Sequence, residues 1–165
     1  MELQVHPRIG VMGPSQCSAR GSQLAREVGL LIARAGGILI CGGGSGVMEA
    51  AAAGAKEAGG ITVGILPGTS AFGTHPHIDI PIVTGMGNAR NVINVLTSQA
   101  IVAIQGAYGT LSEIALALKC GTPVVALETW QVIPPEGGAE PEIITARTPE
   151  EAVSSALAAI RNRQP

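Results

Sequence analysis

The chain has 165 residues, a net charge of −2, 46% hydrophobic residues and only 13% charged residues. This length predicts one domain, residues 1–165, which is long enough to bury a sizeable core. Binding of nucleic acid relies on basic surfaces and aromatic stacking, but this chain is slightly acidic and its only aromatic residues are Phe72, Tyr108 and Trp130. We therefore expect no nucleic-acid partner.

The sequence also indicates whether the protein spans a membrane, in which compartment it works and whether it binds a metal. No uncharged apolar run reaches the roughly 18–20 residues that would span a membrane, and residues 1–13 lack the basic region and apolar run of a signal peptide. Cys17, Cys41 and Cys120 are odd in number and far apart, without the spacing of a zinc site or a disulfide framework. We expect a cytoplasmic protein with reduced thiols, no membrane association and no metal ligands.

Short β-branched runs alternate with longer Ala- and Leu-rich runs along the whole chain. Leu24, Val28, Leu31 and Ile32 show the helical spacing of the first such long run. The pattern predicts strands at residues 9–12, 38–41, 61–66, 78–83, 100–105, 124–127 and 142–145, and helices at residues 18–35, 46–58, 86–98, 110–119 and 149–161. Residues 67–76 and 129–142 are expected to be loops. This alternation predicts an α/β, Rossmann-like, doubly wound and mostly parallel sheet with helices on both faces.

The turn after the second predicted strand is the richest in glycine, with Gly42, Gly43, Gly44, Ser45 and Gly46 in succession. Ligands of parallel sheets bind at the carboxyl ends of the strands, where glycine N–H groups can approach an anion. A tight turn with Ser45 as the helix N-cap is the alternative explanation. Four glycines in five residues favour a phosphate-binding turn, although the spacing matches neither the dinucleotide fingerprint nor the Walker loop.

A second turn of this kind, with the sequence QGAYGTLSE, follows the predicted strand at residues 100–105. Thr110 and Glu113 have the spacing of a capping box, in which each side chain binds the other residue's backbone N–H group. The functional alternative is a carboxylate held at a ligand crevice, where it binds a ribose or acts in acid–base chemistry. The candidate ligand-binding residues of this turn are Gly106, Ala107, Tyr108, Gly109 and Thr110.

Two further segments carry polar residues of interest. Arg90 is the only Lys or Arg between Lys56 and Lys119, and it lies early in a predicted helix, where the helix dipole does not favour a cation. A phosphate or carboxylate ligand and a surface ion pair both explain it. His75 and His77 lack a third metal ligand nearby, so we expect them in a solvated loop.

The motifs GGGSGVMEAAAAGAKEAGGITVGILP, GMGNARN and QGAYGTLSEIALALKCGTPVV, in this order, resemble the LOG-like superfamily. Its members were often labelled possible lysine decarboxylases, and it includes nucleoside 5′-monophosphate phosphoribohydrolases that activate cytokinins. The similarity runs from about residue 9 to residue 127 and is closest to the short branch that includes the molybdenum-cofactor carrier proteins. The resemblance implies a Rossmann-like homodimer or homotetramer whose glycine turns hold the phosphate of a nucleotide or pterin. We expect the uncharged, Ala-rich helix surfaces to form the subunit contacts.

The resemblance also assigns roles to two residues. The hydrolases share a P-G-G-x-G-T-x-x-E motif and an arginine in an M-x-x-R segment, so Glu113 and Arg90 become the catalytic candidates if the protein is an enzyme. The sequence departs from that motif at Gln105, where the motif has proline, and at Ala107, where it has glycine. Ser112 stands where many hydrolases have another acid.

Two functions therefore remain open. The first is a carrier or binding protein for a phosphorylated planar ligand, a nucleotide or the molybdenum-cofactor pterin, with Gly13 and Ser15 beside the ring. The second is a phosphoribohydrolase that releases the base and ribose 5-phosphate from a nucleoside 5′-monophosphate. The motif departures favour binding. Lysine decarboxylation finds no support, because neither Lys56 nor Lys119 lies at a strand end where a Schiff base with pyridoxal phosphate could form.

Overall fold

The computed structural model describes residues 6–163; residues 1–5, which belong to the stretch considered for a signal peptide, and residues 164–165 lie outside the description. Within residues 6–163, seven strands form one sheet in the order β4-β3-β2-β1-β5-β6-β7, and every neighbouring pair is parallel. The strands are β1 (Arg8–Met12), β2 (Ile38–Cys41), β3 (Ile61–Leu66), β4 (Ile80–Val83), β5 (Ala100–Gln105), β6 (Val124–Thr129) and β7 (Ile143–Ala146). The predicted α/β, Rossmann-like fold is confirmed.

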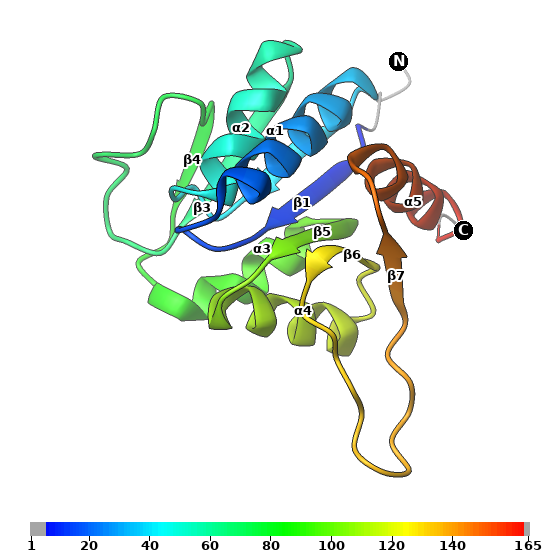
Figure 1. The fold of residues 1–165 in the computed structure, drawn as a ribbon. Helices are drawn as coiled ribbons and strands as arrows, with labels where there is room; N and C mark the ends of the chain where they lie inside the picture. Colours follow the sequence, from blue (N-terminus) through cyan, green and yellow to red (C-terminus); the bar gives the residue numbers. More distant parts are fainter. Residues whose placement is uncertain (1–5, 164–165) are drawn as a thin grey trace, which may run out of the picture.

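Helices cover both faces of this sheet (Figure 1). The helical segments are α1 (Ala19–Arg34), α2 (Val47–Glu57), the 3-10 turn η1 (Gly87–Arg90), α3 (Asn91–Thr97), α4 (Tyr108–Cys120) and α5 (Pro149–Arg161). The side chains of α1, α2 and α5 pack in one hydrophobic cluster, and those of α3 and α4 pack in another. A long loop between β6 and β7 extends away from the body of the molecule (Figure 1).

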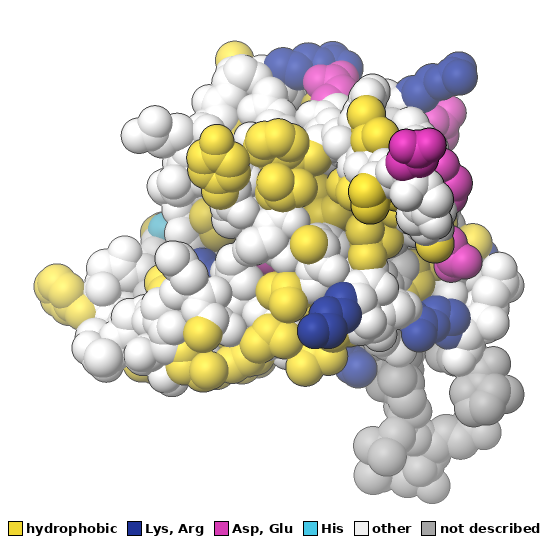
Figure 2. Space-filling view, turned by 90° about the horizontal axis from the view of Figure 1, so that it is seen from below, with side chains coloured by type: hydrophobic (Ala, Val, Ile, Leu, Met, Phe, Trp, Pro, Cys, Tyr) yellow, Lys and Arg dark blue, Asp and Glu magenta, His cyan; other side chains and the backbone are white. Residues whose placement is uncertain are grey.

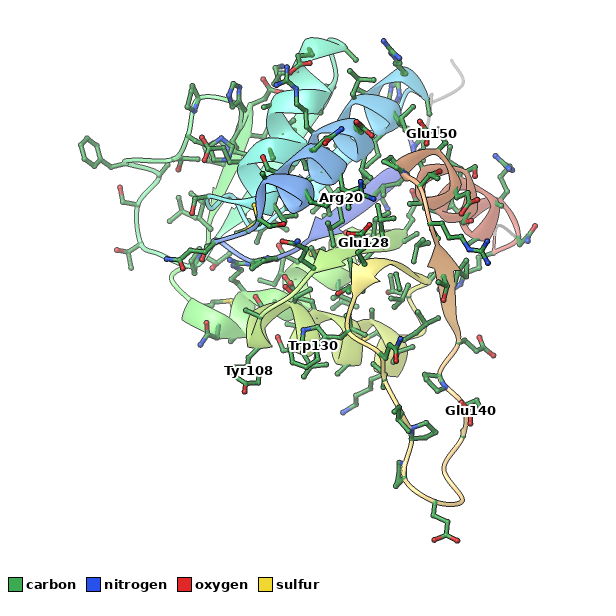
Figure 3. All side chains as sticks on the ribbon, in the orientation of Figure 1. Arg20, Tyr108, Glu128, Trp130, Glu140 and Glu150 are labelled. Carbon is green, nitrogen blue, oxygen red and sulfur yellow. The ribbon has the colours of Figure 1, made fainter. Side chains whose placement is uncertain are left out.

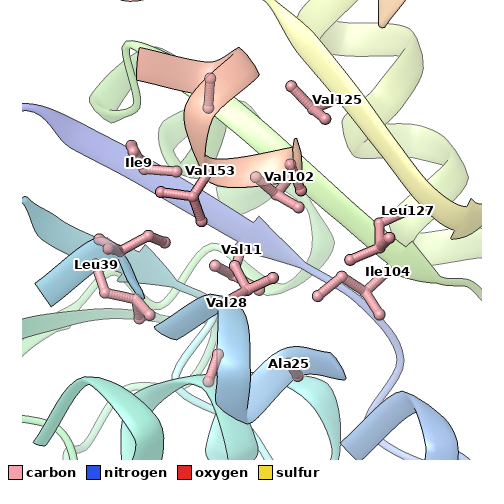
Figure 4. Close-up of a cluster of buried hydrophobic side chains, with 14 of the residues drawn as sticks. Ile9, Val11, Ala25, Val28, Leu39, Val102, Ile104, Val125, Leu127 and Val153 are labelled. Atoms are coloured by element: carbon pink, nitrogen blue, oxygen red, sulfur yellow. The ribbon is translucent and has the colours of Figure 1, made fainter. Parts of the chain in front are cut away.

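The two central strands, β1 and β5, are buried on both faces. Ile9, Val11, Val102 and Ile104 are fully buried between the sheet and the helices of the α1 side (Figure 4). Side chains of a parallel sheet covered on both faces are expected to be almost uniformly apolar, as they are here. This rigid centre fixes the positions of the turns that leave β1 and β5.

Helices α1 and α2 touch through small residues. A Cβ atom added to Gly29 would overlap the carbonyl oxygen of Ala51, and one added to Gly54 would overlap the carbonyl oxygen of Arg26. Ala51 and Ala52 are fully buried in the same contact. The Ala-rich surface of α2 is therefore used within the subunit, and the expectation that it forms subunit contacts is wrong for these residues.

The predicted elements match the observed ones except near a few ends. The predicted helix at residues 86–98 starts as the 3-10 turn η1, and only residues 91–97 are α-helical. The fourth strand begins at Ile80, and just before it the Asp79 carboxylate accepts hydrogen bonds from the backbone N–H of Thr62 (2.9 Å) and from Lys56 Nζ (2.7 Å). Pro81 lies in β4, at the edge of the sheet, as its missing N–H group requires.

Candidate functional site

The two glycine turns at residues 42–46 and 105–110 and the turn that carries Gly13 and Ser15 meet at the carboxyl edge of the sheet. β1 lies between β2 and β5, so the residues that follow these three strands are neighbours. The chain winds outward in opposite directions on the two sides of β1, and this reversal marks the place where open parallel sheets bind ligands. The candidate residues of the three turns therefore belong to one region.

The turn after β2 packs directly on the turn after β1. The hydroxyl group of Ser45 donates a hydrogen bond to the carbonyl oxygen of Ser15 at 3.0 Å. Gly46 has a φ of +66° and is the N-cap of α2, and a Cβ atom on it would lie 2.6 Å from the carbonyl carbon of Ser15. Ser45 makes no capping bond, so the alternative explanation with Ser45 as the N-cap is wrong: Gly46 is the N-cap, and the Ser45 hydroxyl joins the two turns.

The other glycines of these turns differ in how much space surrounds them. A Cβ atom on Gly13 would meet the side chain of Val47, and one on Gly42 would lie 2.5 Å from the guanidinium of Arg90. Gly43 has a φ of +70°, which other residues rarely adopt. Gly44 faces only the flexible end of Met48, with 2.9 Å from the Cβ position to the terminal methyl carbon. Gly44 is therefore the glycine of this turn at which a side chain would meet the least fixed structure.

The turn after β5 opens α4 earlier than the sequence pattern indicates. The helix begins at Tyr108, with Ala107 as an N-cap that has no side-chain bond. Glu113 consequently lies beyond the first turn of α4 and points inward, and its carboxylate is bound by Asn94 at 2.7 Å. The predicted capping box between Thr110 and Glu113 is wrong, because the Thr110 hydroxyl is buried and has no partner among the described residues.

The helices differ in whether a side chain caps their first turn. In α1 the hydroxyl of Ser18 caps the helix, and in α5 the hydroxyl of Thr148 does so. Helices α2 and α4 have no side-chain cap, and both start at the carboxyl edge beside β1. Uncapped N–H groups at a helix N-terminus attract anions, because they carry partial positive charge and need acceptors. Gly44 and Gly109 lie at these two helix starts.

Arg90, Asn94 and Glu113 form a buried polar cluster next to the Gly42 turn. Arg90 Nη1 lies 3.7 Å from Glu113 Oε1, and the two side chains are 13% and 8% exposed. Arg90 ends η1 and Asn94 lies one helical turn further, so both side chains project from the same face toward α4. Arg90 Nε, Asn94 Oδ1 and Thr110 Oγ1 are buried, and none of them has a hydrogen-bond partner within residues 6–163.

Burial dominates the electrostatics of this cluster. It raises the pKa of Glu113, and the Asn94 hydrogen bond and the Arg90 charge oppose this rise. Burial also lowers the pKa of Arg90, with Glu113 acting in the opposite sense. The nearby thiol of Cys41 has its pKa raised by burial to about 11, so it stays protonated at neutral pH. The charges of Arg90 and Glu113 are therefore unfavourably desolvated, and a polar ligand bound beside them would offset part of this desolvation energy.

Ser112 has a structural role at the position where many hydrolases have an acid. Its hydroxyl donates to the carbonyl oxygen of Gly109 at 2.7 Å and accepts a hydrogen bond from the Asn91 side chain at 2.8 Å. These bonds connect the start of α4 to the start of α3. Neither Ser112 nor Asn91 can act as the second carboxylate that hydrolysis of a glycosidic bond commonly uses.

A groove of about 590 Å³ lies on the other side of the β1 turn. It is lined by Pro14, Gln16, Cys17, Ser18, Gln105, Gly106, Ala107, Glu128, Thr129 and Trp130. Its volume is in the range of small-molecule pockets. Gln105 and Glu128 have positive φ values of 51° and 53°, and such strained residues cluster at binding sites.

Hydrogen bonds and an ion pair fix the walls of this groove. The Gln105 side chain accepts from the Ser18 N–H (3.1 Å) and donates to the Ser18 hydroxyl (2.6 Å). Arg20 pairs with Glu128 at 2.7 Å, and this partner lowers the pKa of the Glu128 carboxyl (Figure 3). Trp130 was not singled out as a site residue. The rule that identified the other turns would have found it, since it directly follows β6.

The loop after β3 brings His75 against the glycine turn. His75 is partly buried and its two ring nitrogens are inaccessible to solvent, so the expectation of a solvated loop is wrong for its imidazole. Burial lowers the pKa of His75, a shift that Glu49 opposes and His77 reinforces. Within residues 6–163 no three His, Cys, Asp or Glu side chains gather as a metal site would require, and no helix is long and apolar enough to cross a membrane.

The lowered pKa of the His75 imidazole predicts a specific pH dependence. A histidine with a lowered folded-state pKa contributes stability above its unfolded pKa of about 6.5, and this contribution is lost as the pH falls. We expect the free energy of unfolding, measured in urea, to decrease as the pH falls below about 6.5. His75→Gln should flatten this fall, and His77→Gln, which removes only a secondary cause of the pKa shift, should leave most of it in place. Equal pH profiles for the wild type and His75→Gln would contradict the assignment.

Comparison with known proteins places this geometry in a family. The family model described as SLOG cluster4 matches residues 6–153. The chain belongs to the SLOG cluster4 family. The chain is 45% identical over 147 residues to an uncharacterized protein of Archaeoglobus fulgidus, a match that covers 89% of this chain and 92% of the relative. The superfamily resemblance noted in the sequence thus corresponds to membership of SLOG cluster4.

Two solved structures of this fold carry a description of their ligand. The molybdenum cofactor binding protein of the phototrophic bacterium Rippkaea orientalis is 42% identical, with a TM-score of 0.87 and coverage of 96% of this chain and 99% of that chain. The molybdenum cofactor carrier protein of Chlamydomonas reinhardtii is 39% identical, with a TM-score of 0.80 and coverage of 95% and 99%. This member of SLOG cluster4 is similar to both over nearly its whole length.

Proposed function

We propose that this SLOG cluster4 protein binds and carries the molybdenum cofactor, a phosphorylated planar pterin. The likeness to a molybdenum cofactor binding protein over 96% of the chain at 42% identity carries the proposal. In our proposal the phosphate lies at the uncapped starts of α2 and α4, near Gly44 and Gly109. Arg90 lies beside the same region and supplies a cation toward the anion.

The residues present fit such a ligand. Buried polar atoms that lack partners are rare in native proteins, and each costs about 1–3 kcal/mol when unsatisfied. Here Arg90 Nε, Asn94 Oδ1 and Thr110 Oγ1 are all in this state within the described part of the chain. The starts of α2 and α4, which have no side-chain cap, lie close by, although the first N–H of α2, that of Val47, donates to the carbonyl oxygen of Pro14 at 3.1 Å. Arg90 Nε and the Thr110 hydroxyl can donate to a phosphate, whereas Asn94 Oδ1 accepts and suits an N–H group of the ring system. A phosphorylated ligand uses this combination better than a neutral one.

The alternative, a nucleoside 5′-monophosphate phosphoribohydrolase, finds less support. Glu113 is the carboxylate that the reaction would need, but its Oε1 atom already accepts from Asn94, and its side chain is 8% exposed. Ser112, at the position of a second acid, is engaged with Gly109 and Asn91. These contacts favour a site that holds a ligand over one that attacks it.

The proposed function is tested by expressing the chain in a host that makes the molybdenum cofactor. After purification, any bound pterin is oxidised to its fluorescent form and quantified per chain. We expect a substantial fraction of chains to carry pterin, and a Gly44→Asp control to carry none. Absence of pterin in both proteins, together with release of free base from nucleoside 5′-monophosphates by the wild type but not by Glu113→Gln, would support the hydrolase instead.

The proposal includes a homodimer or homotetramer. Hydrophobic side chains gather on the face formed by α3 and α4, where few charged groups are seen (Figure 2). Exposed apolar residues on α3, on β4 and just before η1 include Leu96, Ile80, Ile82, Val83 and Met86. In our proposal a second copy of the chain covers these exposed apolar side chains. Light scattering that gives a monomer mass would contradict this part of the proposal.

We also propose that the protein works in the cytoplasm. Cys17, Cys41 and Cys120 are all free thiols. Free thiols are stable in the reducing cytoplasm. Fractionation of cells that express the chain with a C-terminal tag would locate it, and recovery outside the cytoplasm would refute the assignment.

A further inference from the structure

Two of the chain's three aromatic residues meet at the carboxyl edge of the sheet, although they are far apart in the sequence. Tyr108 begins α4 and Trp130 follows β6, and their ring centroids lie 6.2 Å apart with an interplanar angle of 28°. Figure 3 shows the two side chains next to each other at the start of α4. In a chain with so few aromatic residues, this pairing concentrates its aromatic surface at the edge that binds ligands.

Trp130 is held in place by its surroundings. Its indole N–H donates to the carbonyl oxygen of Ala107 at 3.3 Å. The indole edge lies over Gly106 so closely that a Cβ atom there would be 2.5 Å from Trp130 Cδ1 and Nε1. Gly106 therefore leaves the space that the indole ring occupies, in addition to any part it has in phosphate binding. Trp130 also lines the 590 Å³ groove.

Tyr108 is exposed to an unusual degree for a residue in a stacked pair. Its relative exposure is 82%, so one face of the ring pair is open to solvent. Exposed aromatic surface that adjoins a groove favours contact with a flat apolar or heteroaromatic group. The first turn of α4, which starts at Tyr108, is one of the uncapped helix ends proposed to hold phosphate.

From this geometry we infer that Tyr108 and Trp130 form a stacking platform for the planar ring of the ligand, beside the 590 Å³ groove that Trp130 lines. This inference rests on the proposed function and adds the subsite for the ring system. The ring lies against the aromatic pair while its phosphate reaches the N–H groups at the start of α4. The platform selects for conjugated heterocycles, and the glycine turns select for the phosphate.

The platform is tested by binding of the free molybdenum cofactor to four proteins: wild type, Tyr108→Ala, Tyr108→Phe and Phe72→Ala. Loss of one stacking partner should weaken binding about tenfold in Tyr108→Ala. Tyr108→Phe keeps the aromatic face and should bind like the wild type. Phe72 is 98% exposed in a loop far from β6 in the sequence, and its replacement controls for the loss of any exposed aromatic residue.

Equal affinity of all four proteins would overturn the platform and leave the proposed function standing. Failure of the wild type itself to retain the cofactor would contradict the proposed function as well. A second measurement uses Trp130, the chain's single tryptophan, as a fluorescent reporter. We expect GMP to quench its emission saturably and ribose 5-phosphate, which lacks a ring, to leave it unchanged. The same response to both compounds would overturn the stacking assignment.

Discussion

Replacement of Gly44 by aspartate should abolish binding of the phosphorylated ligand while the protein remains folded. Gly44 follows β2, and its backbone has a φ that other residues adopt. A Cβ atom there would meet only the flexible end of Met48. The new carboxylate would therefore fit sterically and would place a negative charge where the proposal puts a phosphate. Like charges this close cost several kcal/mol, so we expect affinity to fall about 100-fold or more.

The matched control is Gly44→Asn, which has nearly the same size and no charge. It should bind with much higher affinity than Gly44→Asp, and both variants should show the circular dichroism spectrum of the wild type. Affinity is measured as the cofactor retained at increasing free concentration. If Gly44→Asp bound as tightly as the wild type, the turn at residues 42–46 would not be a phosphate site.

The second large effect concerns stability. We expect Gly29→Ala to lower the free energy of unfolding by about 3 kcal/mol, because overpacking a tight contact forces its elements apart. The new methyl group would overlap the carbonyl oxygen of Ala51, which is part of the α2 backbone and cannot rotate away. Helices α1 and α2 would have to separate, and α2 positions the turn at residues 42–46. Ligand binding should therefore weaken together with stability.

The contrasting control is Gly109→Ala. Gly109 lies in α4, and a Cβ atom there would meet no atom of the described residues within 4 Å. Alanine is favoured over glycine in helices by about 0.5–1 kcal/mol, so this variant should be slightly more stable than the wild type. Urea denaturation of both variants provides the comparison. A Gly29→Ala protein as stable as the wild type would show that the α1–α2 contact is looser than described.

The sheet and the location of the site could be predicted because both depend on local patterns. Strands and helices alternate in composition, and carboxyl ends of parallel strands share one edge, so the turns at residues 42–46 and 105–109 had to lie at the same edge. The observed strand order, with only β1 between β2 and β5, makes them neighbours. The same rule applied to the end of β6 would have identified Trp130. Glycines inside a helical pattern, such as Gly29 and Gly54, also signal close packing and could have predicted the α1–α2 contact.

The sequence-based predictions that were wrong concern details that depend on tertiary contacts. Ser45 has the composition of an N-cap, but its hydroxyl is used by the carbonyl oxygen of Ser15, thirty residues earlier in the sequence. Glu113 has the spacing of a capping box, but Asn94 from another helix takes its carboxylate. The burial of His75 depends on how its loop packs on the glycine turn. Sequence periodicity carries no information about such partners.

The most direct test of the account is to mix the purified chain with free molybdenum cofactor under anaerobic conditions and separate protein from small molecules by gel filtration. Molybdenum and pterin are then measured in the protein fraction. We predict that both elute with the protein in equal amounts, at about one per chain at saturation, and that the pterin is recovered chemically unchanged. Recovery of neither molybdenum nor pterin with the protein at saturating cofactor would contradict the carrier function.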